Sequence, residues 1–459
     1  MRSLSLRLYG VLTSLAQPLV RRKLRKRAVA EPGYAVAVEE RFGQYDAAAV
    51  GTGWCWVHAV SLGETRAAGI LITELRRQHP GIPILLTHGT ATGREEGAKL
   101  LEPGDLQVWQ PWDTPKAVSC FLERFSPRIG VLMETEVWPE MVAACAERRI
   151  PLVLANARLN ERSLASAERL GWLARPAYSS LAAAWAQTEA DSHRLVSLGA
   201  KVEGVYGNLK FDAAPDQRQL AAASQFRAHL PRPLVVLASS RDGEEQLFLD
   251  ALKHFGAGAP LPAEQPGVNS IARQVAGVQW MIVPRHPQRF DEVAALIEAN
   301  GFPVARRSTA GAPTQEEIWL GDSIGEMALY YGLADVALLG GSFEAFGGQN
   351  LIEGAACGCP MVFGPSTFNF AEAAELSLAA GAAVRVETMT QAITAALALV
   401  ADVARRGAMV EAAREFASAN RGAAQRTAAA VLALAESAVT VAAAAEPDVT
   451  QERAEPSLD

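Results

Sequence analysis

Short apolar runs alternate with helical patterns along most of this chain of 459 residues. In the first half, each apolar run is a predicted strand, and helical stretches such as 64–78 and 93–101 lie between the runs. Strands that alternate with helices predict parallel βαβ units and a doubly wound sheet. The predicted strands of this half are 54–60, 82–90, 106–111, 128–135, 150–157, 182–188 and 202–208.

The second half repeats the rhythm, with predicted strands at 233–240, 278–286, 334–342 and 359–366. Two successive series predict an α/β protein with two Rossmann-like domains, which we place at 31–220 and 221–437. Residues 212–232 have proline near both ends and are a candidate linker, and 256–277 are a predicted surface insertion. The Ala-rich and then acidic tail, 438–459, is predicted to be disordered.

Residues 1–30 have a pattern of their own. A moderately apolar run, 4–20, is followed by the basic cluster RRKLRKR at 21–27. No apolar stretch reaches the length of a membrane-spanning helix, and a dense basic cluster after the core argues against a cleavable signal. We interpret 1–30 as an interfacial membrane anchor that binds anionic lipid with its basic side toward the cytoplasm. The alternative is a first helix packed on its domain, followed by a solvated run of charge.

The formal net charge of −7 is unevenly spread, since residues 1–30 contain eight basic residues and no acid. The rest of the chain has 35 basic and 50 acidic residues, which argues against a nucleic-acid partner, because that affinity depends on neutralising phosphates. The five cysteines include only one close pair, Cys357 and Cys359, which is typical of buried thiols rather than of disulfides or a zinc site. We therefore expect no metal.

Polar residues follow the predicted strands of the first half, where doubly wound sheets bind ligands. Glu64 lies at a helix start, where a general base is expected, but its spacing from Ser61 also fits a capping box. Glu134 and Glu136 follow another strand, and Glu136 is alternatively a first-turn charge. Lys210 is placed to meet a negative group, with a simple surface cation as the alternative.

In the second half, Arg285 lies at a strand end and suits a phosphate or carboxylate. The segment GGSFEAFGGQNLIE, at 340–353, has two Gly-Gly pairs between a strand and a helix and predicts a phosphate-binding loop. Asn350 and Glu353 have capping spacing, so a helix-capping role competes with ligand binding there. Neither GxGxxG nor a P-loop is present, which disfavours NAD and ATP chemistry.

Taken together, these motifs closely resemble the 3-deoxy-D-manno-octulosonic acid (Kdo) transferases of lipopolysaccharide biosynthesis, and they span about 54–370 in family order. The matching segments are HAVSLGETRAA (58–68), METEVWPE (133–140), NARLNERS (156–163), GNLKFD (207–212), PRHPQRF (284–290), GDSIGEMALYYGLADVALLGGSF (321–343), GGQNLIE (347–353) and GPSTFNF (364–370).

The resemblance implies a GT-B glycosyltransferase, in which two Rossmann-like domains face each other across a cleft. It implies that 31–220 bind the acceptor, a lipid A precursor (lipid IVA), and that 221–437 bind the donor, CMP-Kdo. Kdo would pass to the 6'-hydroxyl of the acceptor with inversion and without a metal or cofactor. The resemblance also implies attachment through 1–30 to the cytoplasmic face of the cell inner membrane.

By resemblance, Glu64 is the general base, and Glu134 and Lys210 stabilise the transition state. The residues that match the CMP-binding positions of the family are Pro284, Arg285, Ile324, Gly325, Glu326, Asn350, Leu351, Ile352 and Glu353. The sequence departs from the family pattern at Gln349, where His is usual, at 351–352, where Pro-Leu is usual, and at Ile324, where Met is usual. The alternatives are a GT-B enzyme that uses a UDP-sugar and a non-catalytic lipid-surface protein.

Overall fold

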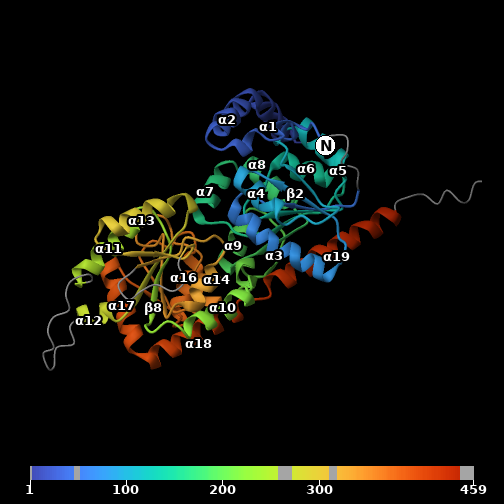
Figure 1. Ribbon diagram of the computed structural model, residues 1–459. Coiled ribbons are helices and arrows are strands. Elements are labelled where there is room, and N and C mark those ends of the chain that lie inside the picture. The colour runs from blue at the N-terminus through green and yellow to red at the C-terminus, as the bar shows by residue number, and fades with distance from the viewer. Residues whose placement is uncertain (1–2, 46–51, 257–270, 310–317, 445–459) are drawn as a thin grey trace, which may run out of the picture. The chain divides into compact units, whose positions relative to one another are not determined.

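The computed structural model describes residues 3–45, 52–256, 271–309 and 318–444 (Figure 1). The chain forms two compact units. The first contains the residues up to Asp212 together with those from Arg421 onward, and the second contains Ala213–Asn420.

The first unit is built on a seven-stranded sheet of order β3-β2-β1-β4-β5-β6-β7, and every strand pair in it is parallel. Alternate side chains of a strand enter different cores: Trp56 packs on one face and Val57 on the other, and both are fully buried. The strands are β1 Cys55–His58, β2 Ile84–His88, β3 Leu106–Trp109, β4 Ile129–Met133, β5 Leu152–Ala157, β6 Ala183–Ala186 and β7 Val202–Val205. The helices are α1 Leu4–Leu15, α2 Gln17–Ala30, η1 Pro32–Ala35, η2 Val38–Phe42, α3 Leu62–Gln78, α4 Ala91–Ala98, α5 Pro115–Phe125, α6 Pro139–Glu147, α7 Glu161–Arg169, α8 Gly171–Ser179, α9 Glu189–Ser197, η3 Leu209–Asp212 and α19 Ala423–Ala444.

The second unit has its own parallel seven-stranded sheet of order β10-β11-β9-β8-β12-β13-β14. The predicted doubly wound α/β organisation is therefore confirmed in both halves. The strands are β8 Leu234–Ser240, β9 Gln279–Pro284, β10 Val304–Arg306, β11 Ile318–Leu320, β12 Val336–Leu339, β13 Met361–Phe363 and β14 Ala383–Arg385. The helices are α10 Gln217–Arg227, α11 Glu244–His254, α12 Ile271–Ala276, η4 Pro287–Arg289, α13 Phe290–Ala299, α14 Met327–Leu333, α15 Leu351–Ala356, α16 Ala371–Ala379, α17 Met389–Ala401 and α18 Val403–Ala419.

The last helix, α19, returns to the first unit, whereas the sequence analysis assigned its first part to the C-terminal domain. It lies beside α3 (Figure 1), and its buried residues, such as Ala428 and Val431, join the core formed by β1 and α3. Gln78 at the end of α3 donates to the Gln425 carbonyl at 3.1 Å. An Ala-rich helix offers a smooth apolar face, so it can dock on a sheet that is distant in sequence.

Asp212 holds the start of α19 against the end of η3. Its carboxylate accepts hydrogen bonds from the backbone N–H groups of Gly422 and Ala424. We expect Asp212→Ala to destabilise the first unit by about 1 kcal/mol, the usual cost of losing a helix cap. Thermal unfolding of the full chain measures this, and an unchanged midpoint would contradict the capping role.

Other boundaries also differ from the predicted ones. The candidate linker 212–232 contains α10, which packs on α14, because its apolar positions have helical spacing. Helix α19 continues to Ala444, into the tail predicted to be disordered, and the rest of that tail lies outside the described residues. Most of the predicted insertion 256–277 also lies outside them, and its end forms α12.

The N-terminal segment forms two helices that meet at Ala16. Helix α1 is packed on the unit along one line: Leu6 and Gly10 are buried, and a Cβ on Gly10 would lie 2.9 Å from Pro115 Cγ. Its leucine and valine side chains other than Leu6 are exposed, including Leu4 (84%) and Leu15 (72%). Within the described residues, we find no helix whose length and apolar character would let it cross a membrane.

Candidate active site

The first candidate site lies at the carboxyl ends of β1 and β4. These two strands are neighbours at the point where the strand order of the first sheet reverses. Loops diverge at such a reversal and leave a crevice, where doubly wound sheets bind ligands. Glu64 follows β1, Glu134 follows β4, and the chain therefore brings both carboxylates to one edge of one sheet.

Glu64 is half-buried in the first turn of α3, and its contacts are those of a modified capping box, in which its carboxylate accepts from the N–H of Val60 and not from that of the N-cap residue Ser61. Its Oε2 accepts from the Val60 N–H at 2.6 Å, and its own N–H lies 3.4 Å from Ser61 Oγ. These contacts fix the carboxylate at the helix start. The Val60 N–H donates to Oε2 and the Ser61 hydroxyl donates to Oε1. Each carboxylate oxygen still has a further lone pair with which it can accept a proton.

The protonation equilibrium of Glu64 is shifted toward neutrality. Burial raises its pKa to about 7, and the nearby carboxylates of Glu134 and Glu136 add to the rise, against the opposing hydrogen bond from Val60. Glu64 and Glu134 follow the neighbouring strands β1 and β4, which is consistent with this mutual repulsion. A carboxyl group with a pKa near neutrality is suited to exchange protons at physiological pH.

Glu134 and Lys210 form an ion pair next to this position. Lys210 Nζ lies 3.2 Å from Glu134 Oε1, and both side chains are mostly buried. Glu134 has a positive φ of 58°, an uncommon conformation for a residue other than glycine. Lys210 is therefore paired with an acid, which differs from the simple surface cation considered above.

Asn156, which the sequence analysis did not single out, joins these groups. It is 2% exposed, its Nδ2 lies 3.5 Å from Glu134 Oε1, and its Oδ1 accepts from the Leu209 N–H at 3.0 Å. It thereby ties the end of β5 to η3, the short helix that holds Lys210. Its position near the end of a predicted strand, at the start of the NARLNERS segment, was the available signal, but only the fold reveals the partners.

Glu136 lies outside the first turn of the following helix, because α6 begins at Pro139. Burial raises the pKa of Glu136. The stabilisation by a helix dipole that was considered for this residue therefore does not come from the first turn of α6. Glu136 lies instead in the short segment between Glu134 and the helix, on the side of the charged cluster.

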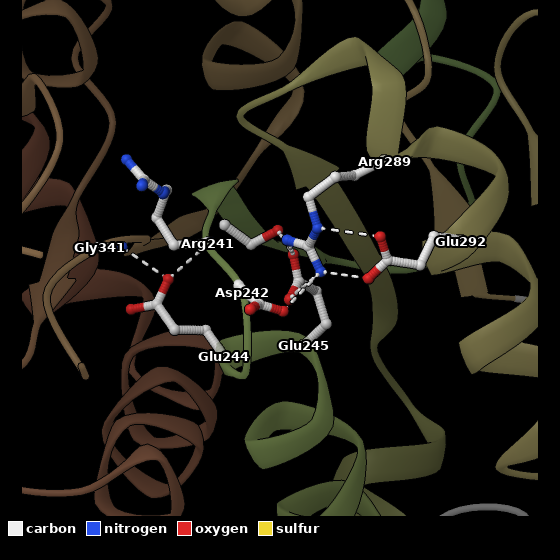
Figure 2. A network of polar contacts seen from close by, with 8 residues as sticks. Arg241, Asp242, Glu244, Glu245, Arg289, Glu292 and Gly341 are labelled. Carbon is white, nitrogen blue, oxygen red and sulfur yellow. Dashed lines mark hydrogen bonds and ion pairs between the residues drawn. The ribbon is translucent and has the colours of Figure 1, made fainter. Parts of the chain in front are cut away.

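The second candidate site lies at the corresponding reversal of the second sheet, between β8 and β12. Figure 2 shows the polar network there. The buried Glu244 carboxylate accepts from the Gly341 N–H at 2.6 Å and from the Phe343 N–H at 3.0 Å. Two N–H groups of the predicted phosphate-binding loop are therefore used internally, and the carboxylate holds that loop in place.

Buried Glu245 forms the other half of this network. It accepts from Arg289 Nη1 at 2.8 Å and from Ser240 Oγ at 2.7 Å, and Arg289 also pairs with Glu292 at 2.9 Å (Figure 2). The charge of Glu245 is thus fully compensated inside the unit, as a buried charge requires. The network joins the loop after β8 to the start of α13.

The residues that match CMP-binding positions lie at this same edge of the second sheet. Pro284 ends β9, and the Arg285 N–H donates to the Ser240 carbonyl at 3.0 Å. Arg285 Nε also lies 3.2 Å from Gln349 Oε1. Gln349, one of the departures from the family pattern, therefore orients the arginine through its side-chain amide.

The loop after β11 contributes a second group. Ile324 is 77% exposed, and Gly325 has a φ of 82°, which favours glycine. Glu326 accepts from Arg307 at 3.0 Å and from the hydroxyl of Ser323. The exposed Ile324 side chain shows that this loop is open to solvent, whereas the Gly325 carbonyl already accepts from Gln219 Nε2 at 2.7 Å.

The third group begins α15. Asn350 caps the helix, with its Oδ1 accepting from the Ile352 N–H at 3.2 Å, so the expected cap is present. Leu351 and Ile352 are buried, and Glu353 is half-buried in the first turn. Leu351 and Ile352 therefore support the loop through packing. The three groups come together at one edge, although their roles in binding stay predictions.

Among the described residues, no group of three or more His, Cys, Asp or Glu side chains is suited to hold a metal ion.

Comparisons with known proteins show which family the chain is similar to. The sequence model of the family described as "3-Deoxy-D-manno-octulosonic-acid transferase (kdotransferase)" matches residues 37–213. A 3-deoxy-D-manno-octulosonic acid transferase of Bordetella pertussis is 45% identical over 81% of this chain and 85% of its own length. One of Haemophilus influenzae is 30% identical over 91% of this chain and 96% of its own.

Solved structures with the same fold are more distant in sequence. A UDP-GlcNAc 2-epimerase of Neisseria meningitidis has a TM-score of 0.54 and 17% identity, over 83% of this chain and 100% of its own. A glycosyltransferase of Rickettsia africae has a TM-score of 0.52 and 13% identity, over 84% and 99%. At these identities the likeness concerns the fold, and it confirms the predicted GT-B class of two Rossmann-like domains.

Proposed function

Because the chain belongs to the 3-deoxy-D-manno-octulosonic acid transferase family of glycosyltransferases, we propose that it transfers Kdo from CMP-Kdo to the 6'-hydroxyl of a lipid A precursor in lipopolysaccharide biosynthesis. The observation that carries this proposal is the cluster at the reversal of the first sheet. There, Glu64, with a pKa raised to about 7, lies within electrostatic range of the Glu134–Lys210 pair.

The proposed step is an inverting displacement. The Glu64 carboxylate takes the proton of the acceptor hydroxyl, whose oxygen forms a bond to the anomeric carbon of Kdo. The bond from that carbon to the CMP phosphate breaks, and its electron pair leaves with CMP. Lys210 offsets the negative charge that develops on the departing phosphate or is carried by the Kdo carboxylate, and Glu134 holds the Lys210 ammonium in place.

Incubating the purified full chain with CMP-Kdo and the lipid A precursor, and weighing the products by mass spectrometry, tests the proposal. We expect the acceptor to gain the mass of one or more Kdo residues. A parallel incubation with UDP-hexoses tests the alternative donor. Transfer from UDP-sugars alone would overturn the choice of donor, and no transfer from any donor would favour the non-catalytic alternative.

We also propose that the N-terminal helices bind the cytoplasmic face of the inner membrane. Support comes from the exposed apolar side chains Leu4, Leu8 and Leu15 of α1 and from the adjacent basic cluster of α2. Apolar side chains that insert into an interface, next to cations that meet anionic headgroups, are the combination on which peripheral membrane binding depends.

Replacing Lys23, Arg25 and Lys26 by Gln is expected to weaken binding to anionic vesicles by up to about 100-fold, because each cation contributes about 1 kcal/mol near such a surface. All three side chains are exposed, so the fold should be unaffected. Vesicle flotation with anionic and with neutral lipid measures the effect.

The matched control replaces exposed arginines elsewhere, Arg218, Arg405 and Arg421, by Gln. This variant loses the same formal charge and should bind vesicles as the unmodified chain does. Equal binding losses in the two variants would mean that total charge, rather than the basic cluster of α2, governs attachment.

A further inference from the structure

Arg241 lies at the centre of the ligand-binding edge of the second sheet, and the family resemblance assigns it no role. It directly follows β8, and β8 neighbours β12 at the reversal of strand order. The loops after the two strands approach closely here, since a Cβ on Gly340, just after β12, would overlap the Ser239 carbonyl. Arg241 therefore stands at the crevice where a doubly wound sheet binds a nucleotide.

The backbone of Arg241 is held by the network of Figure 2. Its N–H donates to Glu244 Oε2 at 2.8 Å, and the same carboxylate accepts from the N–H groups of Gly341 and Phe343. One buried acid thus fixes the loop after β8 relative to the loop after β12. The backbone position from which the Arg241 side chain extends is therefore fixed before a ligand binds.

The Arg241 side chain lies over an aromatic ring instead of pairing with an acid. Its guanidinium carbon is 4.5 Å from the centre of the Phe346 ring, a cation–π distance. Figure 2 shows the guanidinium directed away from the carboxylates of Asp242, Glu244 and Glu245. In the described part of the chain it makes no ion pair, whereas nearby Arg289 pairs with several acids.

Arg241 shares this edge with a second arginine, Arg285. Arg285 and His286 follow β9, whose end pairs with the end of β8 through the hydrogen bond from the Arg285 N–H to Ser240. Burial lowers the pKa of His286, and the positive charges of Arg241, Arg285 and Arg289 lower it further. The carboxylates of Glu244 and Glu245 are already paired with backbone N–H groups and with Arg289, so they leave the charges of Arg241 and Arg285 available to an anion.

We propose that Arg241 binds the phosphate of the donor nucleotide, with Phe346 orienting its guanidinium and Arg285 as the second cation of the site. This proposal rests on the proposed function, in which the leaving group of the donor is a nucleoside monophosphate, CMP. A planar guanidinium, held on one face by an aromatic ring, presents its N–H groups edge-on, in the geometry that suits two phosphate oxygens.

Calorimetric titration of the full chain with CMP and with cytidine tests the inference. We expect Arg241→Gln to weaken CMP binding by about 10- to 100-fold, the effect of losing a charge-assisted hydrogen bond, and to leave cytidine binding unchanged. We expect Arg241→Lys to recover only part of the affinity, because an ammonium lacks the planar fork. CMP affinity within twofold of the unmodified chain in Arg241→Gln would overturn the inference.

Two further variants separate binding from folding. Arg405→Gln removes an exposed arginine of α18 and should bind CMP normally. Phe346→Leu keeps an apolar side chain but removes the ring, and it should weaken CMP binding less than Arg241→Gln does. If all variants melt at the same temperature, a loss confined to Arg241→Gln and Phe346→Leu cannot come from unfolding.

Failure of the inference and failure of the proposed function are distinguishable. If the unmodified chain binds UDP and not CMP, the proposed donor is wrong. The same comparison, with UDP against uridine, then still tests Arg241, because its phosphate contact does not depend on the base. If Arg241→Gln binds CMP normally but transfers Kdo poorly, the cation does not bind the phosphate and the inference fails.

Discussion

Replacing Glu64 by Gln is expected to lower the rate of Kdo transfer by about 10²- to 10⁴-fold, the range typical of a lost general base. Gln keeps an oxygen that accepts from the Val60 N–H, and it suits a capping box as well as Glu does. The helix start should therefore survive while the capacity to take a proton is lost. Initial rates with CMP-Kdo and the lipid acceptor, together with CMP binding by calorimetry, measure the two effects separately.

The pH profile gives a second measure of the same role. Because burial raises the pKa of Glu64 to about 7, the carboxylate is the minor form below that pH. Transfer by the unmodified chain should rise with pH through about 7 and then level off, and the residual activity of Glu64→Gln should lack this step. The raised pKa also means that the folded state loses stability as pH rises from about 4.5 to 7, a loss that the Gln variant should not have.

The matched control for Glu64 is Glu95→Gln. Glu95 is an exposed acid of α4 in the same unit, so its replacement makes the same chemical change away from the crevice. We expect it to transfer Kdo at the normal rate. Normal turnover by Glu64→Gln would show that the carboxylate serves only as a helix cap, and another base would then have to be found.

Replacing Lys210 by Met is expected to lower the transfer rate by about 10²- to 10³-fold, as removal of a donor aimed at developing charge typically does. The loss should fall mainly on kcat, since the ammonium acts where charge builds up, and a smaller effect is expected for Lys210→Arg. Steady-state kinetics at several CMP-Kdo concentrations separate kcat from KM. Glu134→Gln should cause a smaller loss, because it frees the Lys210 ammonium without removing its charge.

The control for Lys210→Met is a substitution that breaks a surface ion pair of the same unit. Lys201 lies 2.9 Å from Glu203, and both are more exposed than Lys210 and Glu134. Lys201→Met breaks a pair of similar length that contributes little to stability and should leave transfer unchanged. If Lys210→Met reduced the unfolding temperature and the rate in proportion, with KM and the pH profile unchanged, its role would be structural.

Much of the fold could be predicted because it depends on local periodicity. Apolar runs such as 150–157 and 233–240 are long enough to identify buried parallel strands, and the polar residues after them mark the ligand-binding edge. The three-residue strands β10, β11 and β14 were not predicted, whereas β13, which is equally short, was found because the longer apolar segment 359–366 surrounds it. The return of α19 to the first unit was also missed, since an Ala-rich helix carries no sign of its partner.

For the candidate site, the sequence by itself proposed Glu64, Glu134, Lys210 and Arg285 as candidates, since their motifs and their places after strands are local properties. Only the tertiary structure decided their partners. It paired Lys210 with Glu134 across 76 positions, placed Asn156 between them, and set the Glu244 carboxylate on the loop after β12. Strand order determines which loops adjoin, and that order results from long-range packing of whole elements, which no local stretch of sequence encodes.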